Sequence, residues 1–301
     1  MIQAVLLSAH GTVDDLNDLD AFVTNVRRGH RPPPELLDEL RRRYEAIGGS
    51  PVNAINADVA RKLQSRLQVP VAWANRLWRP YVRDVLAGLA RGGVRRVALI
   101  PLAQHSAHVY EADARPAAQE MGIELACAAN WGQCAVLHQA FASRIIQSLA
   151  TLPEGRGTTV VMTAHSLPRS VIDAGDPYER EVHGAADAIA HVVRERTRST
   201  ANFAVSFQSQ GLAGAGRSME WLGPDLKTTL DDVKARGDRR VVFAPIGFLA
   251  DNVEILYDLD VEARAMAKER ELSYARAASL NADDDLVEAL AQVARPLFRN
   301  E

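Results

Sequence analysis

The chain has 301 residues, 47% of them hydrophobic and 24% charged, which are ordinary proportions for a globular protein that buries a full core. At about 150 residues per domain, this length predicts two domains. With 35 basic and 38 acidic residues the net charge is −3, which argues against a general binder of nucleic acid or of anionic membranes. Two cysteines, Cys127 and Cys134, exclude a disulfide scaffold, a four-cysteine zinc site and an iron–sulfur cluster within the chain.

The N-terminal sequence MIQAVLLSAHG has neither a basic region before its apolar run nor a cleavage site, so we expect no signal peptide. The longest uncharged run, residues 125–143, is interrupted by Asn, Gln and His side chains and does not fit a membrane-spanning helix. We therefore expect a cytoplasmic protein without stable membrane insertion and without a nucleic-acid partner.

Eight apolar, β-rich runs alternate with amphipathic segments, which is typical of βαβ units with parallel sheets. The runs occupy residues 3–8, 69–74, 95–101, 123–129, 158–164, 201–207, 239–245 and 272–277. The segments 33–47 and 137–152 are predicted helices, and the first should end at Gly48, where glycine permits a left-handed cap.

Four of these runs fall in each half of the chain. The strands before His10 and His165 both end in Ala-His and a small residue, which suggests a duplication. A segment with Pro and Gly at 152–158 predicts a boundary between domains 1–152 and 153–301. The last helix is expected to pack back on the N-terminal half.

Functional side chains of open α/β sheets lie just past the carboxyl ends of strands, where His10 and His165 are expected. An imidazole there can accept a proton or bind a metal, although a capping or core histidine fits the same pattern. Glu254, Asp258 and Glu262 are spaced to share one face of a helix that begins near Asp251. Such a row is either a solvated stripe or a path for a divalent cation and protons.

Arginines gather early in the chain, at 27, 28, 31, 41–43 and 76. Guanidinium groups bind carboxylates bidentately, so the cluster suits a substrate with several carboxylates. A solvated face balanced by Glu35, Glu39 and Glu45 is the alternative. The glycine-containing segments 9–12 and 211–216 match no phosphate-binding pattern, so nucleotide binding is poorly supported.

Taken together, several segments resemble the ferrochelatase family, and they occur in that family's order over nearly the whole chain. They are RRGHRPPPELLDELRRRYEAIGGSP (27–51), TAHSLP (163–168), GDPY (175–178), SFQSQ (206–210), WLGPDL (221–226), APIGFLADNVEILYDLDVEAR (244–264) and SLN (279–281). The resemblance implies two similar Rossmann-like, chelatase-type domains, each a four-stranded parallel sheet flanked by helices, around a porphyrin cleft. It also implies insertion of Fe²⁺ into a porphyrin with release of two protons, in heme biosynthesis.

Residue by residue, the resemblance implies that His165 and Glu254 bind metal and accept protons, and that Asp258 and Glu262 hold a further divalent cation or pass protons outward. Within the family, the sequence of these segments is most similar to the coproporphyrin III enzymes of Gram-positive bacteria. In that branch the positions of Arg27, Arg43, Tyr44, Ser50 and Arg76 contact substrate carboxylates. The resemblance further implies that Fe²⁺ is a substrate and that no further cofactor is required. We expect a monomer that meets other heme-pathway enzymes transiently.

Two departures stand out. The coproporphyrin branch has Tyr where this chain has His10, so an imidazole becomes the expected axial ligand of product iron. The segment 104–111 blurs the family pattern, and its substrate-contacting Tyr is not assigned. A protoporphyrin IX ferrochelatase, a cobalt or other tetrapyrrole chelatase and a non-catalytic heme carrier remain as alternatives.

Overall fold

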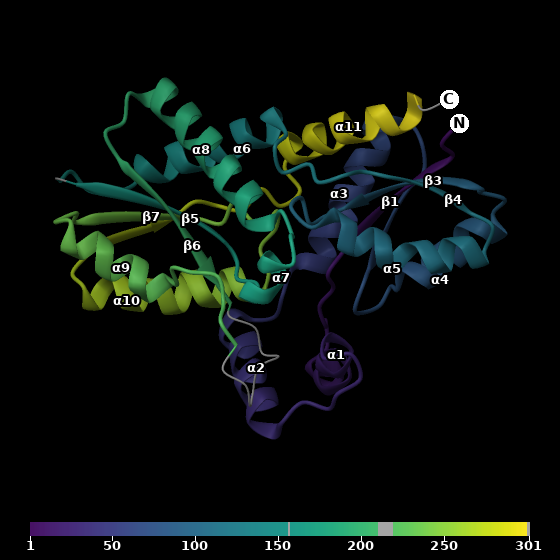
Figure 1. The fold of residues 1–301 in the computed structure, drawn as a ribbon, viewed down its shortest axis with the longest axis horizontal. Helices are drawn as coiled ribbons and strands as arrows, with labels where there is room; N and C mark the ends of the chain where they lie inside the picture. Colours follow the sequence, from purple (N-terminus) through teal and green to yellow (C-terminus); the bar gives the residue numbers. More distant parts are fainter. Residues whose placement is uncertain (156, 210–218, 300–301) are drawn as a thin grey trace. The chain divides into compact units, whose positions relative to one another are not determined.

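The computed structural model describes residues 1–155, 157–209 and 219–299. It divides into two compact units, Met1–Val136 with the chain from Asn281 onward, and Leu137–Leu280. Each unit contains a four-stranded parallel sheet flanked by helices, so the predicted fold class is confirmed (Figure 1). None of the helices in the described ranges has the length and apolar character that a bilayer crossing demands.

The sheet of the first unit has the strand order β2-β1-β3-β4. Helices α3 and α11 cover one face, and α4 and α5 cover the other (Figure 1). The elements of this unit are β1 (Ala4–Ala9), η1 (Leu16–Asp18), α1 (Leu19–Val26), α2 (Pro34–Ile47), α3 (Val52–Leu67), β2 (Val71–Asn75), α4 (Val82–Arg91), β3 (Arg96–Pro101), α5 (Ala107–Glu120), β4 (Glu124–Cys127) and α11 (Asp284–Arg299).

The sheet of the second unit has the equivalent order, β6-β5-β7-β8. An apolar core of β5, β7, α9, α10 and the π-helix η3 fills one side of it, and α8 packs on β6. The elements are α6 (Ala135–Leu149), β5 (Thr158–His165), α7 (Arg169–Asp173), α8 (Tyr178–Thr197), β6 (Asn202–Gln208), α9 (Leu226–Ala235), β7 (Arg240–Ala244), η3 (Ile255–Ala263), α10 (Arg264–Glu269) and β8 (Ser273–Arg276).

Each strand coincides with one of the apolar runs of the sequence, and its ends differ from those of the run by at most two residues. The central strands β1 and β5 are buried nearly throughout, as expected for strands covered on both faces. Helix α2 ends at Gly48, whose φ of 73° is the left-handed cap that the sequence predicts.

The division into units differs from the predicted boundary at 152/153 because helix α6 is grouped with the second unit. Helix α11 is grouped with the first unit. Ser148 in α6 donates a hydrogen bond to the carbonyl of Arg276 in β8 (3.2 Å). Lys62 and Arg66 of α3 form ion pairs with Asp284 and Glu288 of α11. Composition marks a linker in the chain, but it does not show which sheet a neighbouring helix covers.

Glycine 247 allows the loop after β7 to approach the end of β5. Its backbone N–H donates to the carbonyl of Thr163 at 2.9 Å. A Cβ at this position would lie 2.5 Å from the Cβ and 2.6 Å from the Cα of Ala164, well inside van der Waals contact. Ala164 immediately precedes His165, so this close approach sets the path of the chain beside that histidine.

We predict that Gly247→Ala lowers the free energy of unfolding by about 1–3 kcal/mol, because the added methyl overpacks backbone that cannot move away. Gly88→Ala in α4 is the matched control, since the nearest atom to its added methyl is 3.9 Å away. That variant should be more stable by up to about 1 kcal/mol, through helix propensity. Denaturant unfolding of both variants checks the prediction, and equal stabilities would contradict it.

Candidate functional site

His165 and Glu254 face each other at the carboxyl edge of the second sheet. His165 is the last residue of β5, and Glu254 lies in the segment after β7, directly before η3. The Nε2 atom of His165 is 3.3 Å from Oε1 of Glu254, and each side chain is 35% exposed. Strands β5 and β7 pair in parallel, and the chain continues from β5 to β6 on one side of them and from β7 to β8 on the other. The pair therefore occupies the switch point where ligands bind in open α/β sheets.

Neighbouring groups fix the orientation of the His165 ring. Its Nδ1 atom lies 2.5 Å from the carbonyl oxygen of Ser166, which only accepts, so Nδ1 carries a hydrogen. The Tyr178 hydroxyl donates to the carbonyl of His165 at 2.9 Å. The backbone N–H of Ser166 donates to Gln208 at 2.7 Å. The remaining ring nitrogen, Nε2, is thereby directed at Glu254.

Two side chains hold the segment that carries Glu254. The Asn252 Oδ1 atom accepts from the backbone N–H groups of Glu254 and Ile255, at 2.9 and 3.2 Å, and so caps the helix. Arg276, at the end of β8, pairs with Asp251 before the helix at 3.1 Å and with Asp260 inside it at 2.8 Å. These contacts fix Glu254 relative to the sheet.

Of the acidic row, Glu254 directly precedes η3, and Asp258 and Glu262 lie on this π-helix rather than on the regular α-helix that the spacing suggests. The three carboxylates differ in surroundings. Asp258 is only 3% exposed and accepts hydrogen bonds from the hydroxyl of Ser209 and, at 3.5 Å, from Nε2 of Gln208, whereas Glu254 and Glu262 are half-buried. Among the residues that the structure describes, no three His, Cys, Asp or Glu side chains are grouped to hold a metal ion. A cation on this row remains a prediction.

Burial of His165 disfavours its charged form, but nearby negative groups outweigh this effect. The charge of Glu254, its hydrogen bond, the Ser166 carbonyl and the charge of Asp258 together raise the pKa of His165 to about 9. The ring is therefore protonated at neutral pH and paired with the carboxylate. A cation that takes the place of this proton on Nε2 would meet the same two ligands.

In the first unit, His10 follows β1 directly and is exposed. The backbone N–H of Arg76 donates to the carbonyl of Ala9 at 2.8 Å, and that of Leu77 donates to the carbonyl of His10 at 3.0 Å. His10 and Arg76 are thus neighbours at the carboxyl edge of β1 and β2, as the sequence predicts for ligand-binding side chains.

The other residues predicted to contact substrate carboxylates also belong to the first unit, and each has its own partners there. Arg27 caps the end of α1, and Arg43 donates from Nε to Glu39 at 2.8 Å. Ser50 follows α2 and has its hydroxyl buried. Tyr44 is 2% exposed, and its hydroxyl shares a 2.8 Å hydrogen bond with Thr12, so in this structure it holds the loop after His10 against α2.

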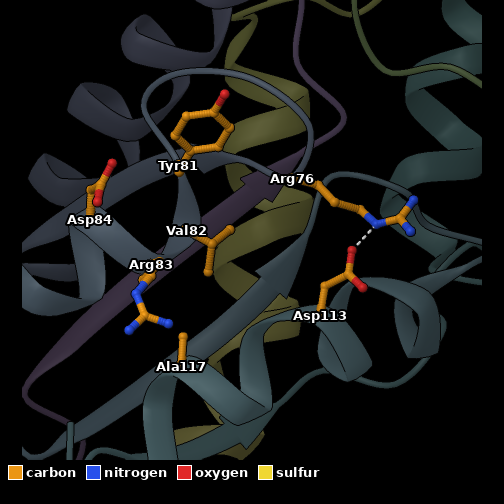
Figure 2. A pocket seen from close by; sticks show the side chains of 7 residues that line it. All are labelled: Arg76, Tyr81, Val82, Arg83, Asp84, Asp113 and Ala117. Carbon is orange, nitrogen blue, oxygen red and sulfur yellow. Dashed lines mark hydrogen bonds and ion pairs between the residues drawn. The ribbon is translucent and has the colours of Figure 1, made fainter. Parts of the chain in front are cut away.

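Arg76 lies beside a pocket of about 340 Å³ and forms an ion pair with Asp113 of α5. Figure 2 shows the two side chains pointing toward each other. The pocket is lined by Arg76, Tyr81, Val82, Arg83, Asp84, Asp113 and Ala117.

Several supporting residues were not identified from the sequence, namely Tyr178, Ser209, Asn252 and Arg276 for the second unit and Asp113 for the first. Tyr178, Ser209 and Asn252 stand inside segments that carry the family resemblance. Arg276 and Asp113 do not, and only the folded chain brings them to their partners.

We predict that the imidazole of His165 titrates near pH 9 in the folded protein and that Glu254→Gln lowers this midpoint by removing the largest favourable charge. The pKa of His165 is raised from the ordinary 6.5 to about 9. The ion pair therefore stabilises the fold fully below pH 6.5, and its contribution is lost as the pH rises through about 9. Histidine-resolved NMR titration measures the shift.

Glu195→Gln is the control for this titration, since it removes a carboxylate of the same unit that pairs instead with the exposed His191. It should leave the midpoint of His165 unchanged. A midpoint of His165 that does not respond to Glu254→Gln would show that the pair is not formed in solution.

Comparison with known proteins places this chain in a family. The ferrochelatase family model matches residues 2–296. A ferrochelatase of Herpetosiphon aurantiacus is 33% identical over 305 residues, covering 96% of this chain and 97% of its own length. A coproporphyrin III ferrochelatase of Anoxybacillus flavithermus is 32% identical over 317 residues, covering 100% of this chain and 98% of its own.

Among solved structures, SirB from Bacillus subtilis with Fe³⁺ matches with a TM-score of 0.61 at 15% identity, covering 100% of this chain and 97% of that one. This likeness supports the fold alone. The family match over nearly the whole chain and relatives above 30% identity agree with the segments that carry the resemblance. The chain belongs to the ferrochelatase family of metal-chelating enzymes.

Proposed function

We propose that the chain inserts Fe²⁺ into coproporphyrin III, giving Fe-coproporphyrin and two protons, with His165 and Glu254 as the catalytic pair. The observation that carries this proposal is the 3.3 Å contact between Nε2 of His165 and the Glu254 carboxylate at the switch point of the second sheet. An imidazole and a carboxylate are together able to bind Fe²⁺ and to accept protons.

The chemistry follows from the orientation of the ring. Insertion removes two protons from pyrrole nitrogens, so each needs an acceptor near the macrocycle. With Nδ1 donating to Ser166, only Nε2 is available to exchange a proton or to bind the metal. Because the resting ring is protonated at neutral pH, it must first lose that proton to Glu254 or to solvent before it can act as acceptor or ligand.

The choice of porphyrin rests on charge. Coproporphyrin III carries four propionates, whereas protoporphyrin IX carries two. Arg27, Arg43 and Arg76 supply guanidinium groups in the first unit, and these bind carboxylates well. The relatives do not decide the choice, since those named for coproporphyrin III and those named simply ferrochelatase are similarly close. A protoporphyrin IX ferrochelatase is the second candidate.

The remaining expectations belong to the same proposal. Porphyrin and Fe²⁺ are the substrates, no further cofactor takes part, and a divalent cation is held near Asp258 and Glu262. The enzyme is cytoplasmic and monomeric and meets other enzymes of heme biosynthesis only transiently.

Anaerobic Fe²⁺ insertion, followed by loss of free-base porphyrin absorbance, tests the proposal. Coproporphyrin III and protoporphyrin IX at equal concentration should give at least about a tenfold higher kcat/KM for coproporphyrin, because one additional charged hydrogen bond already contributes about that factor. His165→Ala and Glu254→Gln should each lower the rate by about a hundredfold or more while porphyrin still binds.

The exposed His191 supplies the control, and His191→Ala should insert iron at the parent rate. Preference for protoporphyrin would overturn the substrate and keep the catalytic pair. Full turnover by His165→Ala would remove the central claim. Porphyrin binding without insertion by the parent chain would favour the heme carrier or a chelatase for cobalt.

His10 gives a separate prediction. Its imidazole is exposed at the end of β1, and we expect it to ligate the iron of the bound product. His10→Ala should therefore change the absorption spectrum of bound Fe-coproporphyrin while altering kcat by less than about threefold, because the proton-accepting pair is untouched. An unchanged spectrum would show that His10 is not the ligand.

A further inference from the structure

We propose that Asp113 is a positioning residue that holds the guanidinium of Arg76 for contact with a carboxylate of the substrate. This inference rests on the proposed function, in which Arg76 is one of the contacts to a porphyrin carboxylate. It adds a residue from α5 for which neither the sequence pattern nor the family resemblance supplies a role.

The backbone places Arg76 where ligands are expected. It follows β2 directly, and its N–H donates to the carbonyl of Ala9 at 2.8 Å, one residue before His10. Side chains at the carboxyl ends of parallel strands reach into the ligand-binding edge of the sheet. The side chain of Arg76 therefore starts beside the expected ligand of product iron.

Helix α5 holds this side chain at two points. The Nε atom of Arg76 donates to Oδ2 of Asp113, and the guanidinium carbon lies 5.8 Å from the centre of the Tyr110 ring. Tyr110 and Asp113 are three residues apart, so they share one face of the helix. As a result only 23% of the Arg76 side chain is exposed, although it stands at the edge of a pocket.

The contact with Asp113 uses only Nε of the guanidinium. Across residues 1–155, 157–209 and 219–299, no other hydrogen bond from the Arg76 side chain is present. Figure 2 shows the two terminal nitrogens directed away from the Asp113 carboxylate. Those two nitrogens form the planar fork that binds a carboxylate bidentately. Asp113 thus restricts the rotation of the guanidinium without occupying its binding edge.

The other charged side chains of the pocket do not contact the ion pair of Arg76 and Asp113. Arg83 of α4 donates to Glu120 at 2.6 Å, and Figure 2 shows Arg83 and Asp84 apart from the pair, beyond Val82 and Ala117. Asp84 lines the same pocket as Asp113 without contacting Arg76. Loss of its charge therefore removes a carboxylate of the same pocket without removing a contact to Arg76.

The test measures the Kd of metal-free coproporphyrin III by fluorescence titration, together with kcat and KM for Fe²⁺ insertion, in the full chain. Arg76→Ala should raise Kd about tenfold, as expected for one charged hydrogen bond. Asp113→Asn should raise Kd and KM roughly threefold with kcat unchanged, because the guanidinium fork is less ordered. On the Arg76→Ala background, Asp113→Asn should no longer raise Kd, as a double-mutant cycle reveals.

Asp84→Asn is the matched control. It should leave Kd unchanged or lower it, because removal of a negative charge favours an anionic ligand. Asp113→Asn acting in that same direction would overturn the inference, and so would equal effects of Asp113→Asn with and without Arg76. These results are distinct from failure of the proposed function, in which the parent chain inserts no iron while the titrations still report binding.

Discussion

The parallel pairing of β5 with β7 is the constraint on which the candidate site depends. It brings His165 at the end of one strand next to the segment after the other, although 88 residues separate His165 from Glu254 in the sequence. The backbone hydrogen bond from Gly247 to Thr163 fixes how closely that segment approaches β5. A side chain at position 247 would move the segment away from β5, and the histidine would lose the carboxylate that sets its protonation state.

The sequence predicts the strands and the position of His165 because both depend on local pattern. Apolar runs that are buried on both faces mark parallel strands without further information. The π-helix is different. The spacing of Glu254, Asp258 and Glu262 fits a helix face in general, and it does not reveal the i→i+5 hydrogen bonding that makes η3 a π-helix. The ion pairs of Arg276 with Asp251 and Asp260 cannot be predicted from local sequence either. Arg276 ends β8, whereas both aspartates lie in the segment after β7.

Local sequence pattern also does not predict which unit a helix belongs to. The run 137–152 is correctly predicted as helical, but its partner is β8, which follows more than a hundred residues later. Tyr44 shows the limit for a site residue. The resemblance implies that Tyr44 contacts the substrate, but it does not predict that the folded chain buries the ring and pairs its hydroxyl with that of Thr12. Burial is decided by packing across the unit, which one helix does not encode.

The equal strand orders of the two sheets allow their residues to be compared by register. Pro101 of β3 pairs with Ser8, two residues before His10, and Ala244 of β7 pairs with Met162, three before His165. Pro101 and Pro245 are therefore equivalent, and nine residues further on stand Tyr110 and Glu254. Where the second unit sets a carboxylate against its histidine, the first sets an aromatic ring against the guanidinium of Arg76. A ring contacts a guanidinium without adding a negative charge, whereas the carboxylate at the equivalent position adds one beside the imidazole, so the two halves differ in charge at this position.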